Sequence, residues 1–197
     1  MVTLTPSLKR KKKTKSKMTF APQRIDAPDF TALTLEEAKA HLELDHTDHD
    51  DYVMALVAAA TDHLDGPNGS LSMVLLGGSW RWDYEATGET CVKLPQTPVV
   101  ELDGATIGGM AYGSATLETR LDGAYVVFSE PQHGRINFEY FAGYEDADAI
   151  PAALKHAIKL HVGSMFEHRE TEVTGTIASK LPHYDILIGP YRRRRLG

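Results

Sequence analysis

The spacing of apolar residues changes twice along the chain, and this change limits the fold more than any other feature. In residues 35–64 and again in 151–169, apolar residues recur every three or four positions, whereas in residues 79–141 they alternate with polar ones. The first spacing predicts α-helix, and the second predicts strands with one buried face. We therefore expect an α+β protein, with a small bundle of three helices, an inserted antiparallel β-sheet and extended N- and C-terminal arms.

The three helices are expected over residues 35–43, 48–64 and 151–169. Thr34 and Glu37 have the spacing of a capping box, which marks the start of the first helix. The buried stripe of the second helix is expected at Tyr52, Leu56, Ala59, Ala60 and His63 or Leu64. That of the third helix is expected at Leu154, Ala157, Ile158, Val162, Met165 and Phe166.

Several short strands are expected in the middle of the chain. Trp80, Trp82 and Tyr84 alternate with charged residues, which indicates one buried face. Further strands are expected over residues 91–94, 99–102, 117–121, 125–128 and 135–141. In the last of these, the buried residues are expected to be Ile136, Phe138 and Tyr140. Asp122-Gly123 predicts a hairpin turn between two of the strands.

We expect one folded domain (residues 31–170) between a basic arm (residues 1–30) and a C-terminal arm (residues 171–197), and the charges are distributed unevenly among them. Residues 18–191 hold all 27 Asp and Glu but only ten of the 21 Lys and Arg, a formal charge of −17. Such a body is poorly suited to wrapping DNA and well suited to repelling it, although acidity also serves solubility. Met18 is an alternative first residue.

The basic arm contains seven positive charges within nine residues. They are Lys9, Arg10, Lys11, Lys12, Lys13, Lys15 and Lys17. The run is either a contact for nucleic acid or an acidic partner, or a solubilising arm.

The sequence predicts no catalytic residue, no metal site and no cofactor. Cys91 is the single cysteine, so an intrachain disulfide and a CxxC zinc site are excluded. His156 and His161 are five residues apart, which misses the spacing of two ligands on one helix face. The glycines match no phosphate-binding loop. No apolar run reaches the roughly 18 residues of a membrane span, so no membrane partner is expected.

The C-terminal arm combines large apolar residues with arginines. Tyr184, Ile186, Leu187, Ile188 and Tyr191 precede Arg192 to Arg195. Such a set is typical of an interface anchor, or of a segment that packs back on its own domain. If it lies outside the domain, removal of residues 181–197 leaves the remainder folded.

Five motifs follow one another along the chain. They are LTLEEAKAHLELD with DHDDYVMALVAAATDHLDG, then LPQTPV, INFEYFAGY, IPAALKHAIKLHVGSMFEHRE and LIGPYR. Together and in this order they resemble the head–tail connector (adaptor) family of long-tailed phages and phage-derived particles. They cover about residues 33–193. The basic arm has no counterpart in the family pattern.

The resemblance implies a non-enzymatic virion protein of the neck, assembled in the bacterial host cytoplasm. It implies a ring, a dodecamer by analogy, between the portal protein and a stopper or tail protein, with genomic DNA passing through the lumen. It also implies a portal-binding C-terminal segment, made of Ile186, Leu187, Pro190, Tyr191, Arg192, Arg193, Arg194 and Arg195. The acidic body leads us to expect more acidic than basic side chains toward the channel.

The sequence leaves other functions open. Another neck or tail component, such as a stopper or tail-completion protein, would share the ring symmetry. A nucleic-acid-binding protein would use the basic arm, and a hydrolase would need a site that the sequence does not reveal.

Overall fold

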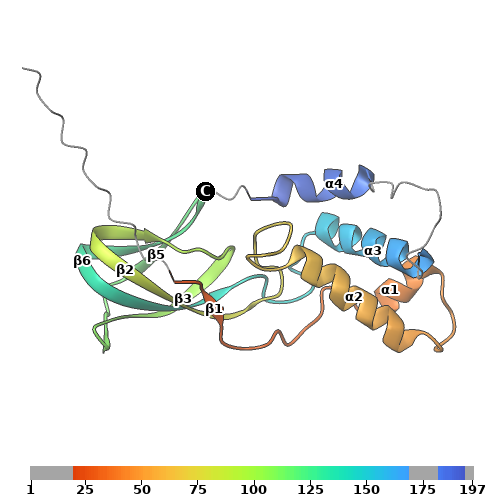
Figure 1. Ribbon diagram of the computed structural model, residues 1–197, viewed down its shortest axis with the longest axis horizontal. Coiled ribbons are helices and arrows are strands. Elements are labelled where there is room, and N and C mark those ends of the chain that lie inside the picture. Colours follow the sequence, from red (N-terminus) through yellow and green to blue (C-terminus); the bar gives the residue numbers. More distant parts are fainter. Residues whose placement is uncertain (1–19, 169–181, 194–197) are drawn as a thin grey trace, which may run out of the picture.

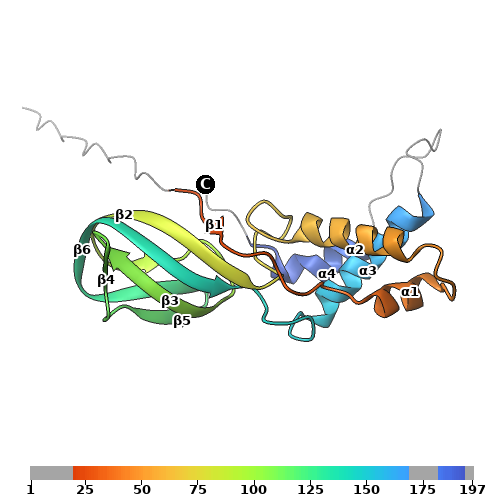
Figure 2. The ribbon, with the colours of Figure 1, turned by 90° about the horizontal axis from the view of Figure 1, so that it is seen from below.

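The computed structural model describes residues 20–168 and 182–193. They form two lobes that lie side by side along the long axis of the molecule, one of helices and one of strands (Figures 1 and 2). The α+β class expected from the sequence is confirmed.

The helical lobe begins with the expected capping box. Its elements are α1 (Leu35–Leu42), α2 (Asp50–Leu64), α3 (Ala152–Glu167), α4 (Pro182–Ile188) and the 3-10 helix η1 (Gly189–Tyr191). At the start of α1, the Glu37 amide donates to the Thr34 hydroxyl at 3.2 Å, and the Thr34 amide donates to the Glu37 carboxylate at 3.0 Å. The two bonds satisfy amides that lack a partner within the helix, so this prediction is confirmed.

The buried face of α2 differs from the expected one. Its buried residues are Val53, Val57, Ala60, Thr61 and Leu64. Tyr52 and Leu56 are half-buried, and Ala59 is exposed. Apolar residues occupy most of the circumference of this helix, so its own sequence does not select one stripe. Packing against α1 and α3 selects it.

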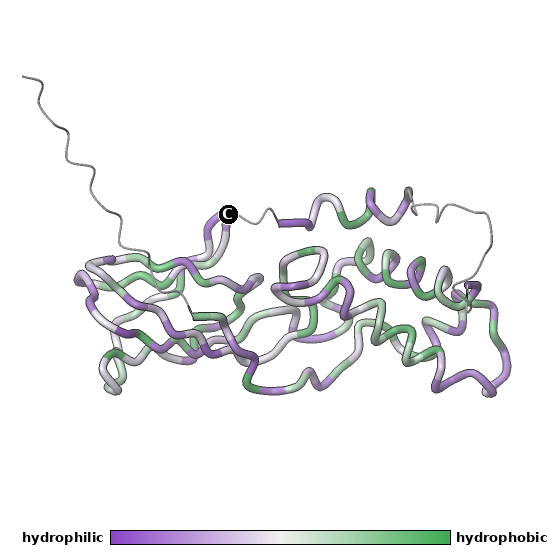
Figure 3. Tube along the Cα trace, in the orientation of Figure 1, coloured by the Kyte–Doolittle hydropathy of each residue, from purple (hydrophilic) through white to green (hydrophobic). Residues whose placement is uncertain are grey.

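α3 buries the face that the sequence predicts. Leu154, Ala157, Ile158 and Val162 are buried. Met165 and Phe166 are half-buried and pack against the same core. Figure 3 shows hydrophobic residues along α2 and α3, and hydrophilic residues in the loop that joins α1 to α2.

The β lobe is one antiparallel sheet. Its strands are β1 (Gln23–Arg24), β2 (Gly78–Lys93), β3 (Val99–Ile107), β4 (Met110–Ala111), β5 (Thr116–Arg120) and β6 (Gly123–Ala142). Their order is β1-β2-β6-β3-β4, and β5 also pairs with β6. The expected hairpin turn is present, with Leu121 and Asp122 at its tip, since Arg120 pairs with Gly123.

Two long strands replace four of the short strands expected from the sequence. β2 joins the expected strand at Trp80 to the one at residues 91–94, and β6 joins residues 125–128 to 135–141. The two pair from Gly78 with Ala142 to Lys93 with Tyr125. The register of the pairing shifts on either side of Glu89. The alternation of apolar and polar residues is lost there, which is why the sequence predicted two separate strands. A β-bulge bends a strand without ending it.

Aromatic rings fill the inner face of the sheet. Trp80, Trp82, Tyr84, Ile136, Phe138 and Tyr140 are all buried, as predicted. The rings of Trp82 and Phe138 stack with centroids 5.7 Å apart. Charged residues alternate with these along β2, so the opposite face of the sheet is polar.

The chain from Phe20 to Leu33 runs along both lobes. Gln23 and Arg24 pair with Arg81 and Trp80 of β2. The Ser79 amide donates to the Asp26 carboxylate at 2.8 Å. This part of the expected arm is therefore fixed by backbone pairing, and its basic residues 9–17 lie outside the described residues.

Candidate functional site

The C-terminal segment, defined here as residues 182–193, packs on the helical lobe. Ile188 has no exposed surface and belongs to the core of that lobe. Tyr184, Leu187 and Tyr191 are partly buried against the same core. Where an extended arm was expected, these residues form a fourth helix and a 3-10 turn. The sequence left two interpretations open, an interface anchor and a segment that packs back on its own domain. The described part of the segment packs on its own domain.

The sequence contains a signal for this helix, although no helix was expected there. Tyr184, Leu187, Ile188 and Tyr191 stand at positions i, i+3, i+4 and i+7, which is the stripe of an amphipathic helix. The signal is short, since α4 has only seven residues. Packing against α3 supplies the stability that so short a helix lacks alone.

Three aromatic side chains join α4 to the helices beneath it. The ring centroids of His63 in α2 and His161 in α3 are 5.2 Å apart, and that of Tyr184 lies 5.7 Å from His161. Burial, and then the neighbouring His63, lower the pKa of His161. Burial also raises the pKa of the Tyr184 phenol. This contact therefore favours the neutral forms of His161 and Tyr184.

The end of the C-terminal segment connects the two lobes. The Arg193 amide donates to the Leu71 carbonyl at 2.9 Å. The Arg193 guanidinium donates to the backbone carbonyl of Asp122 at 3.4 Å, at the tip of the β5–β6 hairpin. The Arg192 guanidinium lies 3.5 Å from the Asp185 carboxylate, and both side chains are about half exposed. Arg193 thus fixes the end of the segment, whereas Arg192 keeps an exposed charge.

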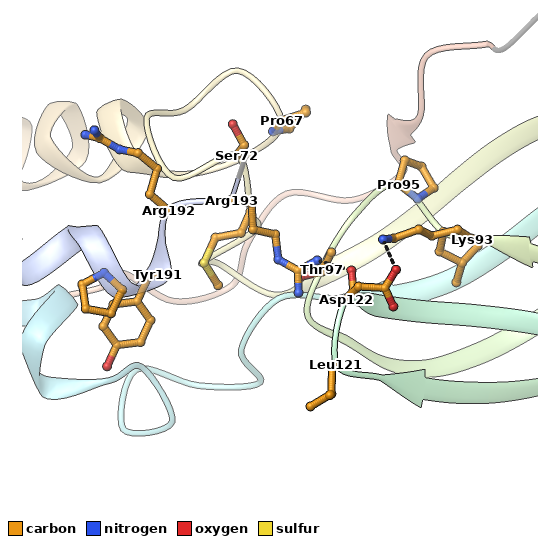
Figure 4. A pocket seen from close by; sticks show the side chains of 13 residues that line it. Pro67, Ser72, Lys93, Pro95, Thr97, Leu121, Asp122, Tyr191, Arg192 and Arg193 are labelled. Carbon is orange, nitrogen blue, oxygen red and sulfur yellow. Dashed lines mark hydrogen bonds and ion pairs between the residues drawn. The ribbon is translucent and has the colours of Figure 1, made fainter. Parts of the chain in front are cut away.

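A hollow of about 850 Å3 lies where the two lobes meet (Figure 4). It is lined by Pro67, Ser72, Met73, Lys93, Leu94, Pro95, Thr97, Leu121, Asp122, Pro190, Tyr191, Arg192 and Arg193. Among these described residues three are cations and one is a carboxylate. The walls are otherwise largely apolar. Such a hollow favours a group that is apolar with an acidic part.

The carboxylate of the hollow is held by its neighbours. Lys93 lies 2.8 Å from Asp122, and the Tyr125 hydroxyl also donates to that carboxylate. The hydrogen bonds from Lys93 and Tyr125 lower the pKa of Asp122 to about 2. The same pairing raises the pKa of Lys93. Asp122 is therefore ionised and held by Lys93 at 2.8 Å. Arg192 has the longer ion pair, 3.5 Å to Asp185, and the more exposed side chain, so it is the cation better placed to meet an incoming acidic group.

Two large apolar side chains stand exposed in this region. Ile186 on the outer side of α4 is 71% exposed, and Leu121 at the hairpin tip is fully exposed. An exposed isoleucine or leucine is ordinary alone, but Leu121 lines the hollow and so extends the apolar surface available there to a partner. The sequence predicted the hairpin, but it did not identify Leu121, Lys93 or Asp122 as residues of a binding site. No local signal in the sequence places that turn beside the C-terminal segment.

The structure brings half of the expected portal-binding residues together. Pro190, Tyr191, Arg192 and Arg193 all line the hollow. Ile186 lies outside it and Leu187 packs on the core. Arg194 and Arg195 lie outside the described residues, as do Lys9, Arg10, Lys11, Lys12, Lys13, Lys15 and Lys17.

Two further observations bear on the chemistry of the described residues. Within residues 20–168 and 182–193, no group of three or more His, Cys, Asp or Glu could hold a metal ion. In the same ranges, no helix has both the length and the apolar character needed to cross a membrane.

The fold is similar to that of neck chains in gene transfer agent (GTA) particles. One similar structure is described as the neck of an empty GTA particle computed with C6 symmetry. Its sequence is 19% identical to this one, the TM-score is 0.70, and the match covers 90% of this chain and 97% of that chain. Others come from the neck of the native particle with C12 symmetry and from the virion of the native particle, each with 18% identity, a TM-score of 0.65 and the same coverage. No family model and no curated protein sequence matches the chain. At these identities the likeness defines the fold.

Proposed function

We propose that the protein is a structural component of the neck of a phage or phage-derived particle, a connector between portal and tail or stopper. The fold match to GTA neck chains, which spans 90% of this chain and 97% of that chain, carries the proposal. Because both lobes are included, the match concerns the whole architecture. As a neck component the protein has a structural and not a catalytic role.

The proposed assembly is a closed ring of identical subunits. The related necks are described with C6 and C12 symmetry, and a dodecamer is compatible with both. In such a ring each subunit presents one face to a different face of the next. DNA would pass through the lumen without being recognised. The formal charge of −17 over residues 18–191 supports this, since an acidic lining repels phosphates.

The C-terminal segment and the hollow beside it form the proposed portal-binding site. Ile186 offers an exposed apolar side chain, and Arg192, one of the residues that line the hollow, offers a half-exposed guanidinium. A portal segment with a large apolar residue and a carboxylate would satisfy both. Arg194 and Arg195 would add positive charge to the same contact.

Removal of the whole segment is a poor test of this site. Ile188 is fully buried in the helical core, so deletion of residues 181–197 is expected to destabilise that lobe, contrary to our expectation from the sequence. A single exposed residue avoids the difficulty.

The test of portal binding is a pull-down of the particle's own portal protein with the Ile186→Ser variant. We expect about a tenfold or greater loss of affinity, as for a buried interface anchor. Val100→Ser is the matched control, since Val100 is an exposed apolar residue of β3 in the other lobe. Equal binding by the two variants would contradict the proposed site.

The test of the neck role itself is electron microscopy. The protein mixed with its portal should form a ring coaxial with it, and particles made without the protein should be heads that lack tails. Antibody labelling should place the protein at the junction of head and tail. Tailed particles of normal yield in its absence would overturn the proposal.

A further inference from the structure

We propose that the basic segment, residues 9–17, docks on the acidic outer face of this chain's own β-sheet. The outer face is the side of the sheet opposite the aromatic core. Its carboxylates come from three adjacent strands, and they are Asp83 and Glu85 of β2, Glu139 of β6, and Glu101 and Asp103 of β3. This surface is distinct from the hollow and from the C-terminal segment.

The outer face holds more negative charge than its own cations neutralise. Arg81 binds Glu139 at 2.7 Å, and Arg135 binds Asp83 at 2.6 Å. Glu85, Glu101 and Asp103 make no ion pair with any residue that the structure describes.

The pKa of Asp103 reflects, besides burial, the repulsion between neighbouring carboxylates on this face. Its pKa is raised by partial burial, and further by the nearby charges of Glu101 and Glu139. A docked cation would relieve this repulsion.

The chain traced toward the basic segment runs along the edge of this face. Gln23 pairs with Arg81 in antiparallel register, so the chain traced toward its N-terminus follows β2 from Arg81 toward Glu85. The indole of Trp82 donates to the Phe20 carbonyl at 2.8 Å.

The ring of Phe20, the first described residue, contacts a residue of the outer face. The Arg135 guanidinium is 4.7 Å from the centroid of the Phe20 ring. Arg135 is the register partner of Glu85. The chain therefore leaves the described region beside a carboxylate that has no described ion-pair partner.

The distances allow docking without any other change. Lys17 is three residues from Phe20, a span of about 10 Å, and Lys9 is within about 36 Å along an extended chain. The seven positive charges of the segment exceed the net negative charge of the face. Because the segment is tethered at Phe20, its effective concentration at the face is of the order of millimolar. Weak individual ion pairs then suffice for docking at low salt.

The experiment is limited tryptic digestion of the full-length protein, because the basic segment offers seven cleavage sites that docking would protect. The face variant is Glu85→Gln with Glu101→Gln and Asp103→Asn. The control variant is Asp45→Asn with Glu145→Gln and Asp148→Asn, which has the same change of charge at exposed positions outside the sheet. We expect the segment of the face variant to be cut about tenfold faster than that of the wild type, and the control to match the wild type. Raising NaCl to about 0.5 M should accelerate cleavage of the wild type.

A second measurement does not depend on the face variants. A spin label on Cys91, the single cysteine, lies further along β2 in the direction that the segment would follow. Amide NMR signals of residues 9–17 in the wild type should be broadened by this label and recover at high salt.

Three outcomes would overturn the proposal. Equal cleavage of face and control variants would show that the carboxylates do not matter. Protection that is lost on dilution would mean that the segment binds another copy. Protection that requires added DNA, and that is equal in both variants, would make the segment a nucleic-acid contact.

Discussion

The two lobes are built from the chain in opposite ways. All strands of the β lobe except β1 lie within one continuous stretch, residues 78–142, and its core includes six buried aromatic residues. The helical lobe gathers three separate stretches, which come before the sheet, after it and from the C-terminal segment. Its core consists mainly of Leu, Ile, Val and Ala.

This difference ties the stability of one lobe to the proposed portal-binding segment. The core of the helical lobe includes Ile188, three residues from Tyr191, whereas the core of the β lobe includes no residue of that segment. A change at Ile188 should therefore affect the helices alone. The two lobes can be followed separately, because both tryptophans are in the β lobe and far-ultraviolet circular dichroism reports mainly the helices.

The largest effect is expected for Phe138→Ala. Phe138 is fully buried and stacks on Trp82, so its removal leaves a cavity in the centre of the β lobe. We expect a loss of about 3–5 kcal/mol in the free energy of unfolding, measured by urea titration with tryptophan fluorescence. Val100→Ala, at an exposed position on β3, should cost less than about 0.5 kcal/mol. If the circular dichroism transition of Phe138→Ala shifts equally, the lobes unfold as one unit and the comparison fails.

Ile188→Ala tests the other lobe, with an expected cost of about 2–4 kcal/mol. Ile188 has no exposed surface, so the variant leaves a cavity beneath α4. The circular dichroism transition should move, and the fluorescence transition should not. Ile186→Ala is the matched control, because the same substitution two residues earlier removes a side chain that is 71% exposed. Equal costs at the two positions would mean that α4 is not packed as described.

The sequence predicted those parts of the fold that depend on local signals. The capping box at Thr34, the buried stripe of α3 and the alternation at Trp80, Trp82 and Tyr84 each specify their element within a few residues. The same reasoning failed at Glu89, where a bulge looks like a strand end, and in α2, whose apolar residues surround the helix. In both places a partner element decides the outcome.

The candidate site was predicted less completely. The resemblance to the connector family pointed to Pro190, Tyr191 and Arg192, which line the hollow. Lys93 and Asp122 were missed, because they come from strand ends that are distant in sequence and meet the segment only in the folded chain. Ile186 and Ile188 are the same residue type two positions apart, but only Ile188 lies on the stripe at Tyr184, Leu187 and Tyr191 that packs on the helices, so Ile188 is buried and Ile186 is exposed.

Thr34→Ala should have a smaller effect, about 1 kcal/mol, again confined to the helices. The variant removes the hydroxyl that accepts from the Glu37 amide at the start of α1. Thr34→Ser keeps that hydroxyl and should remain close to the wild type. A shift in the fluorescence transition of Thr34→Ala would indicate that α1 also supports the β lobe.

The smallest effect expected is a dependence of the helical lobe on pH. The pKa of His161 is lowered from its ordinary value of 6.5 by burial, and then by His63, so the unfolded chain takes up this proton first as the pH falls. Stability is therefore complete above about pH 7.5 and should decrease as the pH falls through 6.5 and below. His41, whose pKa is also lowered mainly by burial, adds to the same trend.

The measurement is a urea titration by circular dichroism at intervals from about pH 8 to 5.5. His161→Gln should flatten the decrease, because it removes a proton acceptor beneath α4, whereas His133→Gln, at an exposed position in the β lobe, should leave it unchanged. A decrease that is as steep in His161→Gln as in the wild type would show that the contact of His63, His161 and Tyr184 does not couple α4 to pH.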